Sequence, residues 1–459
     1  MTDTLRDLAG RPTPAWTREQ AARLERTDGA VAPVIYPPER PLDPDVHVWD
    51  TWLLRTPAGD IAEVDGYRVI VSLTAPSDLL PGKRHDVATL RFFYSADGRE
   101  WQSGGRVFTE TEPLGQRQWA GSAVLFEPGT TDRDDGGTES PADADHELVV
   151  YYTAAGDREA AELTYGQHLA VATGGRFRSD DDGLRVEGPF EHESMLYADG
   201  EHYEREEQSR GMIYTFRDPW YFEDPATGEA YVLFEGNTPV PEGSDACGSD
   251  ATAQEFNGSV GIARCAPEDP TDVELLPPLL DAVCVNQELE RPHVIVRDGT
   301  YYLFVSSHRH TFAPGIEGFD GLYGFAADSL FGDYDPLNDT GLVVTNPANA
   351  PFQAYSWLVY EHRDELLVTS FFNYWDYDRE TLDDVGFLPE AEQFRRFGGT
   401  LAPTIRLGVD GRRTRIVGTL DHGHLPLPRE DLPETEDERI ARLRAERGDD
   451  SEEYGAYRG

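Results

Sequence analysis

The stretch His293-Val294-Ile295-Val296-Arg297-Asp298-Gly299-Thr300-Tyr301-Tyr302-Leu303-Phe304-Val305 predicts two β-strands joined by a tight turn. Both apolar runs are rich in β-branched or aromatic residues, which favour strands. The dipeptide Asp298-Gly299 between them is typical of a two-residue hairpin, because both positions of such a turn need a positive φ. This unit of a strand, a polar turn and an aromatic-rich second strand carries the fold prediction, because it recurs.

The unit occurs five times along the chain. The first strands of its copies start near Trp52, Ala123, Trp220, His293 and Trp357. Spacings of about 65–95 residues are too long for a solenoid but fit propeller blades that carry long insertions. We therefore predict an all-β fold, a five-bladed β-propeller with an active site in its central channel. An irregular pair of β-sandwiches would not explain a fivefold repeat.

The chain before the repeats predicts a small helical segment. Residues 1–29 form this segment, and residues 30–425 are assigned to the propeller. One helix is expected over residues 16–26, because Thr17 and Gln20 have the spacing of a capping box at its start.

The chain after the repeats is dominated by Glu, Asp and Arg. Residues 426–459 are expected to form an acidic, charged tail, either as a short exposed helix through Ile440 and Leu443 or as a frayed end. Two inserts within the repeats, 128–146 and 239–258, are rich in Gly, Asp, Ser or Thr and are predicted to be surface loops.

The net charge is strongly negative. The chain has 86 Asp and Glu against 40 Lys and Arg, a formal charge of −46, and Lys83 is its one lysine. The acidic residues alternate with ordinary apolar segments, so disorder is a poor explanation. Self-repulsion of this size is screened by concentrated salt, and we predict a halophilic protein. The alternative is an acidic protein with high-GC coding bias. Nucleic acid and anionic membranes are disfavoured as partners.

Targeting signals are not recognisable in the sequence. No apolar run approaches the roughly 20 residues of a membrane span. Residues 1–6 lack the charged-then-apolar pattern of a leader and have no twin arginine. Export would need a non-standard route or a leader outside this sequence; otherwise the protein is cytoplasmic, and localisation stays open.

The three cysteines are Cys247, Cys265 and Cys284, so at least one thiol is unpaired within a single chain. No Cys-x-x-Cys spacing indicates a metal site. A Cys247–Cys265 or Cys265–Cys284 bridge is compatible with the sequence, but we expect buried thiols.

The residues just before the first strand of each copy carry the candidate chemistry. Equivalent positions in a propeller converge at one end of the channel, so Asp50, Asp218 and Glu290 should share a pocket with Arg217 and Arg291. A single carboxylate beside a strand is more often a turn residue or an ion-pair partner. Three at the same repeat offset, flanked by Trp or Arg, favour a functional site.

Clustered carboxylates with aromatic neighbours suit glycosyl transfer. In retaining enzymes one carboxylate attacks the anomeric carbon, and a second group about 5–5.5 Å away protonates the leaving oxygen. The proximity of like charges raises the pKa of one partner, which supplies the acid at neutral pH. Trp and Tyr stack on sugar faces, and Arg binds hydroxyl groups.

The motifs resemble, in order, those of the sucrose-dependent fructosyltransferases of glycoside-hydrolase family 68, the levansucrases and inulosucrases. The resemblance covers roughly residues 30–425 and implies the same five-bladed propeller. It implies that Asp50 is the nucleophile and that Asp218, in an Arg-Asp-Pro motif, holds sugar hydroxyls and stabilises the transition state. Glu290 would be the general acid/base.

The resemblance also implies the groups that bind substrate. The fructosyl ring would lie against Trp49, Trp119 and Arg217. The other expected substrate-binding residues are Ser122, Glu235, Glu288, Arg291, His308 and Tyr355.

Three positions depart from common family patterns. Ala120 stands where relatives have a serine that bonds the nucleophile. Gln287 stands where many Gram-positive relatives have a calcium-ligating Asp, so we predict no metal, and no organic cofactor is implied. His308 resembles the Gram-negative branch, and we expect it on the acceptor side of the site; the alternative is a structural histidine at a strand end.

The expected function is a retaining fructosyltransferase that cleaves sucrose, releases glucose and transfers fructosyl to sucrose, fructan or water. The alternatives are a sucrose hydrolase with little transfer and a carbohydrate-binding propeller without catalysis. The Asn-Asp-Pro and Glu-Cys motifs of the related invertase and fructanase family are not present. Sucrose and fructan oligosaccharides are the expected partners, and no obligate protein partner is evident. The linkage, β-2,1 or β-2,6, stays open.

Overall fold

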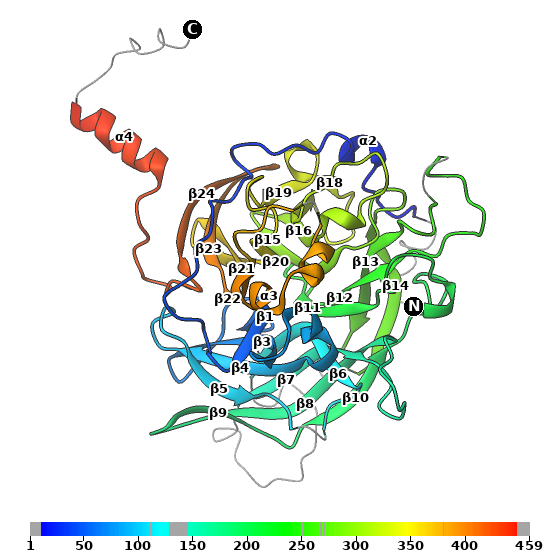
Figure 1. The fold of residues 1–459 in the computed structure, drawn as a ribbon, viewed down its shortest axis with the longest axis horizontal. Coiled ribbons are helices and arrows are strands. Elements are labelled where there is room, and N and C mark those ends of the chain that lie inside the picture. Colours follow the sequence, from blue (N-terminus) through cyan, green and yellow to red (C-terminus); the bar gives the residue numbers. More distant parts are fainter. Residues whose placement is uncertain are drawn as a thin grey trace.

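The structure is a computed structural model in which the chain forms a five-bladed β-propeller (Figure 1). Residues 1–10, most of the predicted loop 128–146 and the tail beyond 447 lie outside the described residues. The described residues are 11–109, 112–127, 146–248, 252–266, 269, 271–379 and 381–447.

Each blade is an antiparallel sheet whose innermost strand is the first strand of one predicted repeat, and the apolar side chains of these strands form the core between blades. The first blade contains β1 (Val46–Arg55), β2 (Glu63–Val64), β3 (Tyr67–Pro76), β4 (Thr89–Ser95) and β5 (Gln102–Arg106). The second contains β6 (Arg117–Phe126), β7 (Glu147–Ala155), β8 (Gln167–Asp180), β9 (Gly183–Glu187) and β10 (Glu191–Leu196). The third contains β11 (Arg217–Glu223), β12 (Ala230–Asn237), β13 (Gly258–Cys265) and β14 (Val273–Asp281).

The last two blades follow the same plan. The fourth contains β15 (Glu290–Arg297), β16 (Thr300–Ser307), β17 (Gly321–Ala327), β18 (Asp335–Pro336) and β19 (Leu342–Thr345). The fifth contains β20 (Ala354–His362), β21 (Glu365–Tyr374), β22 (Phe397–Leu401), β23 (Pro403–Asp410) and β24 (Arg413–His422). The chain passes through the blades in order around the ring, and β1 packs against β21 and β22 to close it (Figure 1).

The first two blades are joined into one sheet. A short parallel pairing of β1 with β6, Leu54 opposite Ala123 and Arg55 opposite Val124, links their innermost strands. The five blades therefore form four hydrogen-bonded sheets.

Both predicted hairpin turns are confirmed. In the fourth blade, Arg297 pairs with Thr300 across Asp298 and Gly299, whose φ angles are 52° and 78°. The first blade has the same turn at 65–66. Asp and Gly tolerate this left-handed backbone, which matches the twist of the paired strands.

The five innermost strands share a feature that the sequence did not predict. The pairing register of each strand with its neighbour shifts near its start, a β-bulge. Four non-glycine residues at the bulges have positive φ: 44° at Asp50, 63° at Asp218, 52° at Arg291 and 59° at Ser356. Such strained residues cluster at functional sites, where a bulge re-aims side chains.

These bulges correct the expected alignment of the three carboxylates. Asp50 and Asp218 occupy the positive-φ position, but in the fourth blade Arg291 occupies it. Glu290 lies one residue earlier in its strand, at the position of Trp49. The three carboxylates are therefore not at the same repeat offset.

The helices are few and short. The capping box of Thr17 and Gln20 forms as predicted, but α2 (Arg18–Ala21) is a single turn rather than a helix over 16–26, because the chain turns after Ala22 and buries Leu24. Among the described residues, the other α-helices are α3 (Glu390–Arg396) and α4 (Glu436–Arg447), which projects away from the propeller (Figure 1). In the described ranges, no helix has the length and apolar character needed to cross a membrane.

The cysteine prediction was wrong. Cys247 and Cys284 form a disulfide, with Cα atoms 4.9 Å apart and 37 positions apart in sequence. The 239–258 loop folds back on the segment before β15, where Cys284 donates its backbone N–H to Phe256. Cys265 is buried at the end of β13, outside this disulfide. Sequence spacing alone could not show which loop returns to which strand.

Candidate active site

A pocket of about 490 Å³ lies at the end of the channel where the innermost strands begin. This size is within the usual range for small-molecule sites. Ten of the twelve predicted site residues line it, all except Ser122 and Glu235: Trp49, Asp50, Trp119, Arg217, Asp218, Glu288, Glu290, Arg291, His308 and Tyr355.

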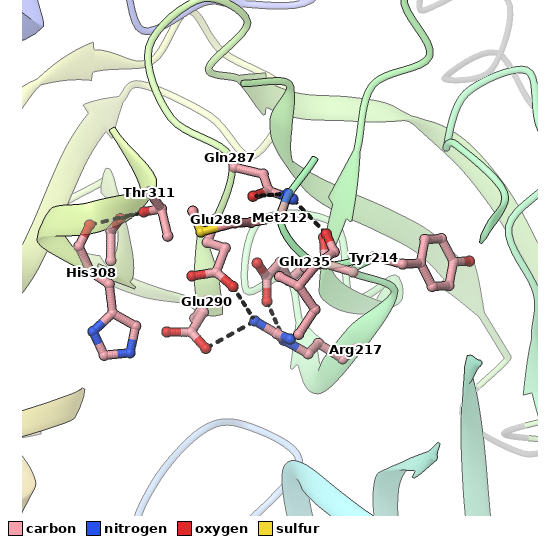
Figure 2. Close-up of polar contacts among 12 residues, drawn as sticks. Met212, Tyr214, Arg217, Glu235, Gln287, Glu288, Glu290, His308 and Thr311 are labelled. Atoms are coloured by element: carbon pink, nitrogen blue, oxygen red, sulfur yellow. Dashed lines mark hydrogen bonds and ion pairs between the residues drawn. The ribbon is translucent and has the colours of Figure 1, made fainter. Parts of the chain in front are cut away.

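Arg217 joins three glutamates at the base of the pocket (Figure 2). Its Nε donates to Glu235 at 2.7 Å, and one terminal nitrogen donates to Glu288 at 3.1 Å and to Glu290 at 3.0 Å. Glu235 is fully buried behind the arginine, so it positions Arg217 rather than lining the pocket.

Asp218 is held by two neighbouring blades. Its backbone N–H donates to Thr153 of β7 at 2.9 Å, and its carboxylate accepts the N–H of Arg291 at 3.1 Å. Burial and the nearby Glu290 carboxylate raise the pKa of Asp218, against the opposing charges of Arg217 and Arg291. A carboxylate oxygen of Asp218 lies within 4.8 Å of one of Glu290.

Ser356, from the fifth blade, lies beside Asp50. Its hydroxyl accepts from Arg291, whose other terminal nitrogen donates to the Thr51 carbonyl at 2.9 Å. Burial raises the pKa of Asp50, while Arg291 and the neighbouring Ser356 side chain lower it. This serine thus places a hydroxyl beside the candidate nucleophile, where Ala120 has none.

His308 and Tyr355 form a stack beside Glu290. Their rings lie 3.6 Å apart at an interplanar angle of 8°, and the Tyr355 hydroxyl donates to Glu290. Burial lowers the pKa of His308, but Asp320, 3.1 Å from its Nδ1, and the pocket glutamates outweigh burial and raise this pKa to about 9. His308 is therefore a cation at neutral pH.

A helix missed in the sequence completes the aromatic wall. The 3₁₀ helix η1 (Pro81–Val87) places Arg84 and His85 in the pocket. The His85 ring lies 5.4 Å from that of Trp49, and Trp119 donates its indole N–H to the His85 carbonyl at 3.1 Å. These two residues stand outside the repeated motif, so no repeat pattern indicated them.

Ser122 does not reach the pocket. It is buried in β6, where its hydroxyl accepts the backbone N–H of Tyr221 at 3.1 Å, a contact between the second and third blades. Ser356, in contrast, stands in the fifth copy of the motif at the position of Asp50, which was the signal that could have identified it.

The carboxylates do not form a convincing cation site. Oxygens of Asp218, Glu235 and Glu290 lie within 4.8 Å of one another, close enough for a shared ion. The Arg217 guanidinium already bonds two of them, so a metal would have to displace a buried positive charge.

Gln287 is the residue at which the sequence predicts no bound calcium. Its side-chain oxygen accepts the Met212 N–H at 2.9 Å and its nitrogen donates to the Ile213 carbonyl, so it ties the 211–214 segment to the segment just before β15 (Figure 2). The neutral amide replaces a charged ligand and uses both of its polar ends.

This arrangement predicts that chelation has no effect on stability. EDTA should leave the melting temperature of the protein unchanged, because Gln287 makes the cross-link without an ion. A melting temperature that falls with EDTA and recovers with calcium alone would contradict this prediction.

The comparisons with known proteins agree with this geometry. The family model described as levansucrase/invertase, of glycoside-hydrolase family 68, matches residues 5–426. An extracellular sucrase of Zymomonas mobilis is 34% identical over 430 residues, which cover 90% of this chain and 94% of the relative. A levansucrase of Rahnella aquatilis is 33% identical over 440 residues, 90% of this chain and 96% of the relative.

A solved structure is more similar still. The inulosucrase from Halalkalicoccus jeotgali bound to kestose is 61% identical, with a TM-score of 0.85, and the match covers 92% of this chain and 100% of that one. The matched length, the propeller and the site geometry lead to one assignment. The chain belongs to glycoside-hydrolase family 68, the levansucrase/invertase family.

Proposed function

We propose that the chain is a retaining fructosyltransferase that cleaves sucrose, with Asp50 as nucleophile, Asp218 as transition-state stabiliser and Glu290 as general acid/base. The observation that carries this proposal is the convergence of the three carboxyl groups on one pocket with aromatic walls. Family membership supports the reaction, and the geometry supports the division of roles.

The first step breaks the glycosidic bond of sucrose. The fructosyl ring packs against Trp49 and Trp119, and the carboxylate of Asp218 accepts bonds from its hydroxyls. Asp50 attacks the anomeric carbon while Glu290 gives its proton to the departing glucosyl oxygen, so glucose leaves neutral and a fructosyl ester remains on Asp50. This step requires Asp50 to be ionised and Glu290 to carry a proton when sucrose is bound.

The second step uses the same groups in reverse. Glu290, now ionised, removes a proton from a hydroxyl of sucrose, fructan or water. That oxygen attacks the fructosyl carbon and frees Asp50 as a carboxylate. The hydrogen bonds from Tyr355 and Arg217 keep Glu290 in one orientation through both steps.

The test is a sucrose assay in which glucose and fructose are measured separately. Glucose in excess of fructose supports transfer, equal amounts indicate a hydrolase, and no glucose indicates a binding protein. The similarity to an inulosucrase favours a β-2,1-linked product. NMR of the polymer distinguishes this linkage from β-2,6.

His308 should control transfer rather than bond cleavage, and it should do so through its charge. The pKa of about 9 means that the ring is cationic below pH 9 and neutral above it. The transfer-to-hydrolysis ratio should therefore be steady through neutral pH and shift near pH 9. His308→Ala should change this ratio or the product length, with glucose release altered by less than about tenfold, or about 1.4 kcal/mol.

His308→Arg is the matched control for this prediction, because an arginine stays charged throughout. The change near pH 9 should disappear in this variant. An unchanged product profile in both variants would favour a structural role for the histidine.

Salt should increase both activity and stability, as expected for a halophilic protein. The charge of −46 is self-repulsive in dilute buffer, and salt shortens the Debye length from about 10 Å at 0.1 M to about 3 Å at 1 M. The melting temperature should rise by several degrees above 0.1 M salt and continue to rise beyond about 0.5 M. Equal stability and activity in dilute buffer would refute the halophilic assignment.

A further inference from the structure

Tyr165 is an exposed aromatic residue at the rim of the active-site pocket. It lies in the loop between β7 and β8, its side chain lines the pocket, and it is 49% exposed. Isolated exposed aromatic residues are ordinary on protein surfaces. Tyr165 differs because the buried Arg117 and the partly exposed Asp86 hold its ring in place.

Arg117 supports one face of this ring. The arginine is 1% exposed, and its guanidinium carbon lies 4.6 Å from the Tyr165 ring centroid. A terminal nitrogen of Arg117 donates to the Thr164 carbonyl at 2.8 Å, which fixes the loop to β6. The ring edge is fixed as well, because the Tyr165 hydroxyl donates to Asp86 at 3.1 Å.

The same arginine connects the rim of the pocket to Trp119 in its wall. Its guanidinium carbon lies 5.2 Å from the ring centroid of Trp119, the expected wall of the fructosyl site. Trp119, Arg117 and Tyr165 thus form a continuous stack that leads from the carboxylates toward solvent. The uncovered face of Tyr165 is a flat surface of the kind on which a sugar ring packs.

We propose that Tyr165 is an acceptor-binding residue, on which a sugar ring of a growing β-fructan chain stacks while the chain's terminal hydroxyl reaches the fructosyl-enzyme. The proposal rests on the fructosyl transfer proposed above. A Tyr165 ring that is already immobilised loses little conformational entropy when an acceptor binds. Stacking on this ring therefore favours fructan chains over water as the acceptor. Sucrose as donor occupies the pocket below the rim and should not need this contact.

Direct binding separates this proposal from the transfer reaction itself. In the Asp50→Asn background, which cannot turn over, calorimetry should give a dissociation constant for a β-fructan tetrasaccharide that rises about five- to tenfold when Tyr165→Ala is added. Sucrose binding should stay unchanged. Tyr165→Phe, which keeps the ring, should retain most of the tetrasaccharide affinity.

Tyr197→Ala is the matched control. Tyr197 is 59% exposed in the same blade and stacks on His168 at 4.7 Å, but it does not line the pocket. This variant should bind the tetrasaccharide as the parent does. In the active enzyme, Tyr165→Ala should shorten the products while glucose release from sucrose stays within about twofold.

Three results would overturn the proposal: unchanged tetrasaccharide binding in Tyr165→Ala, an equal loss in Tyr197→Ala, or an equal loss of sucrose binding. A wild-type enzyme that releases equal glucose and fructose would contradict the transfer reaction instead. In that case the comparison of tetrasaccharide binding with and without Tyr165→Ala would still show whether Tyr165 binds the sugar.

Discussion

Asp50→Asn should lower glucose release from sucrose by at least about 10⁴-fold, the scale expected when a covalent nucleophile is removed. Asparagine has nearly the same shape as aspartate, so the packing beside Ser356 should be kept. It cannot form the fructosyl ester, so the covalent route is lost.

Two measurements keep this result interpretable. The melting temperature and the sucrose dissociation constant of Asp50→Asn should stay close to the parental values, which would separate lost chemistry from lost folding. Asp218→Asn should also be severely impaired but for a different reason, because it weakens the transition states of both steps. Near-normal turnover by Asp50→Asn would overturn the assignment of the nucleophile.

The fold was predictable because its signal is local and repeated. Each first and second strand of the repeat corresponds to an innermost strand and its neighbour, and the two Asp-Gly turns form as expected. The convergence of Asp50 and Asp218 followed from the repeat, whereas Glu290 enters the pocket from one residue earlier in its strand. Strand pattern, turn chemistry and repeat number all pointed to one architecture.

The remaining details depend on contacts between segments far apart in sequence. The bulge positions fix whether Glu290 or Arg291 is equivalent to Asp50, and strand patterns do not reveal a one-residue shift. The Cys247–Cys284 bridge depends on the path of a long insertion. Arg84 and His85 enter from the 3₁₀ helix η1, which lies outside the repeated strand pattern.

Ser356 illustrates the same limit within the site itself. The sequence showed that Ala120 lacks the hydroxyl found in relatives, which left the support of Asp50 open. The structure places a hydroxyl there from another blade, since the Ser356 side chain lies beside Asp50 and is itself held by Arg291. The role of Ser356 in place of a serine at 120 becomes clear when equivalent positions of the five innermost strands are compared.

Glu290→Gln should be severe with sucrose and much milder with a better leaving group. The glucosyl oxygen must leave unprotonated in this variant, and general acid catalysis contributes about 10²–10⁴-fold. A fructosyl donor with an activated leaving group needs little protonation, so the first step should recover. The second step still lacks its base, and the fructosyl-enzyme should accumulate.

Mass spectrometry of the digested Glu290→Gln enzyme, after reaction with the activated donor, should therefore find one added fructosyl unit on the peptide that contains Asp50. The matched variant is Asp218→Asn, which should accumulate no adduct, because Asp218 assists formation and breakdown of the ester alike. Arg217 and Tyr355 bond Glu290 through its two carboxylate oxygens, and glutamine can preserve only part of this pattern, so the melting temperature serves as the folding control. Label on Asp218, or no recovery with the activated donor, would mean that the roles of the carboxylates are assigned wrongly.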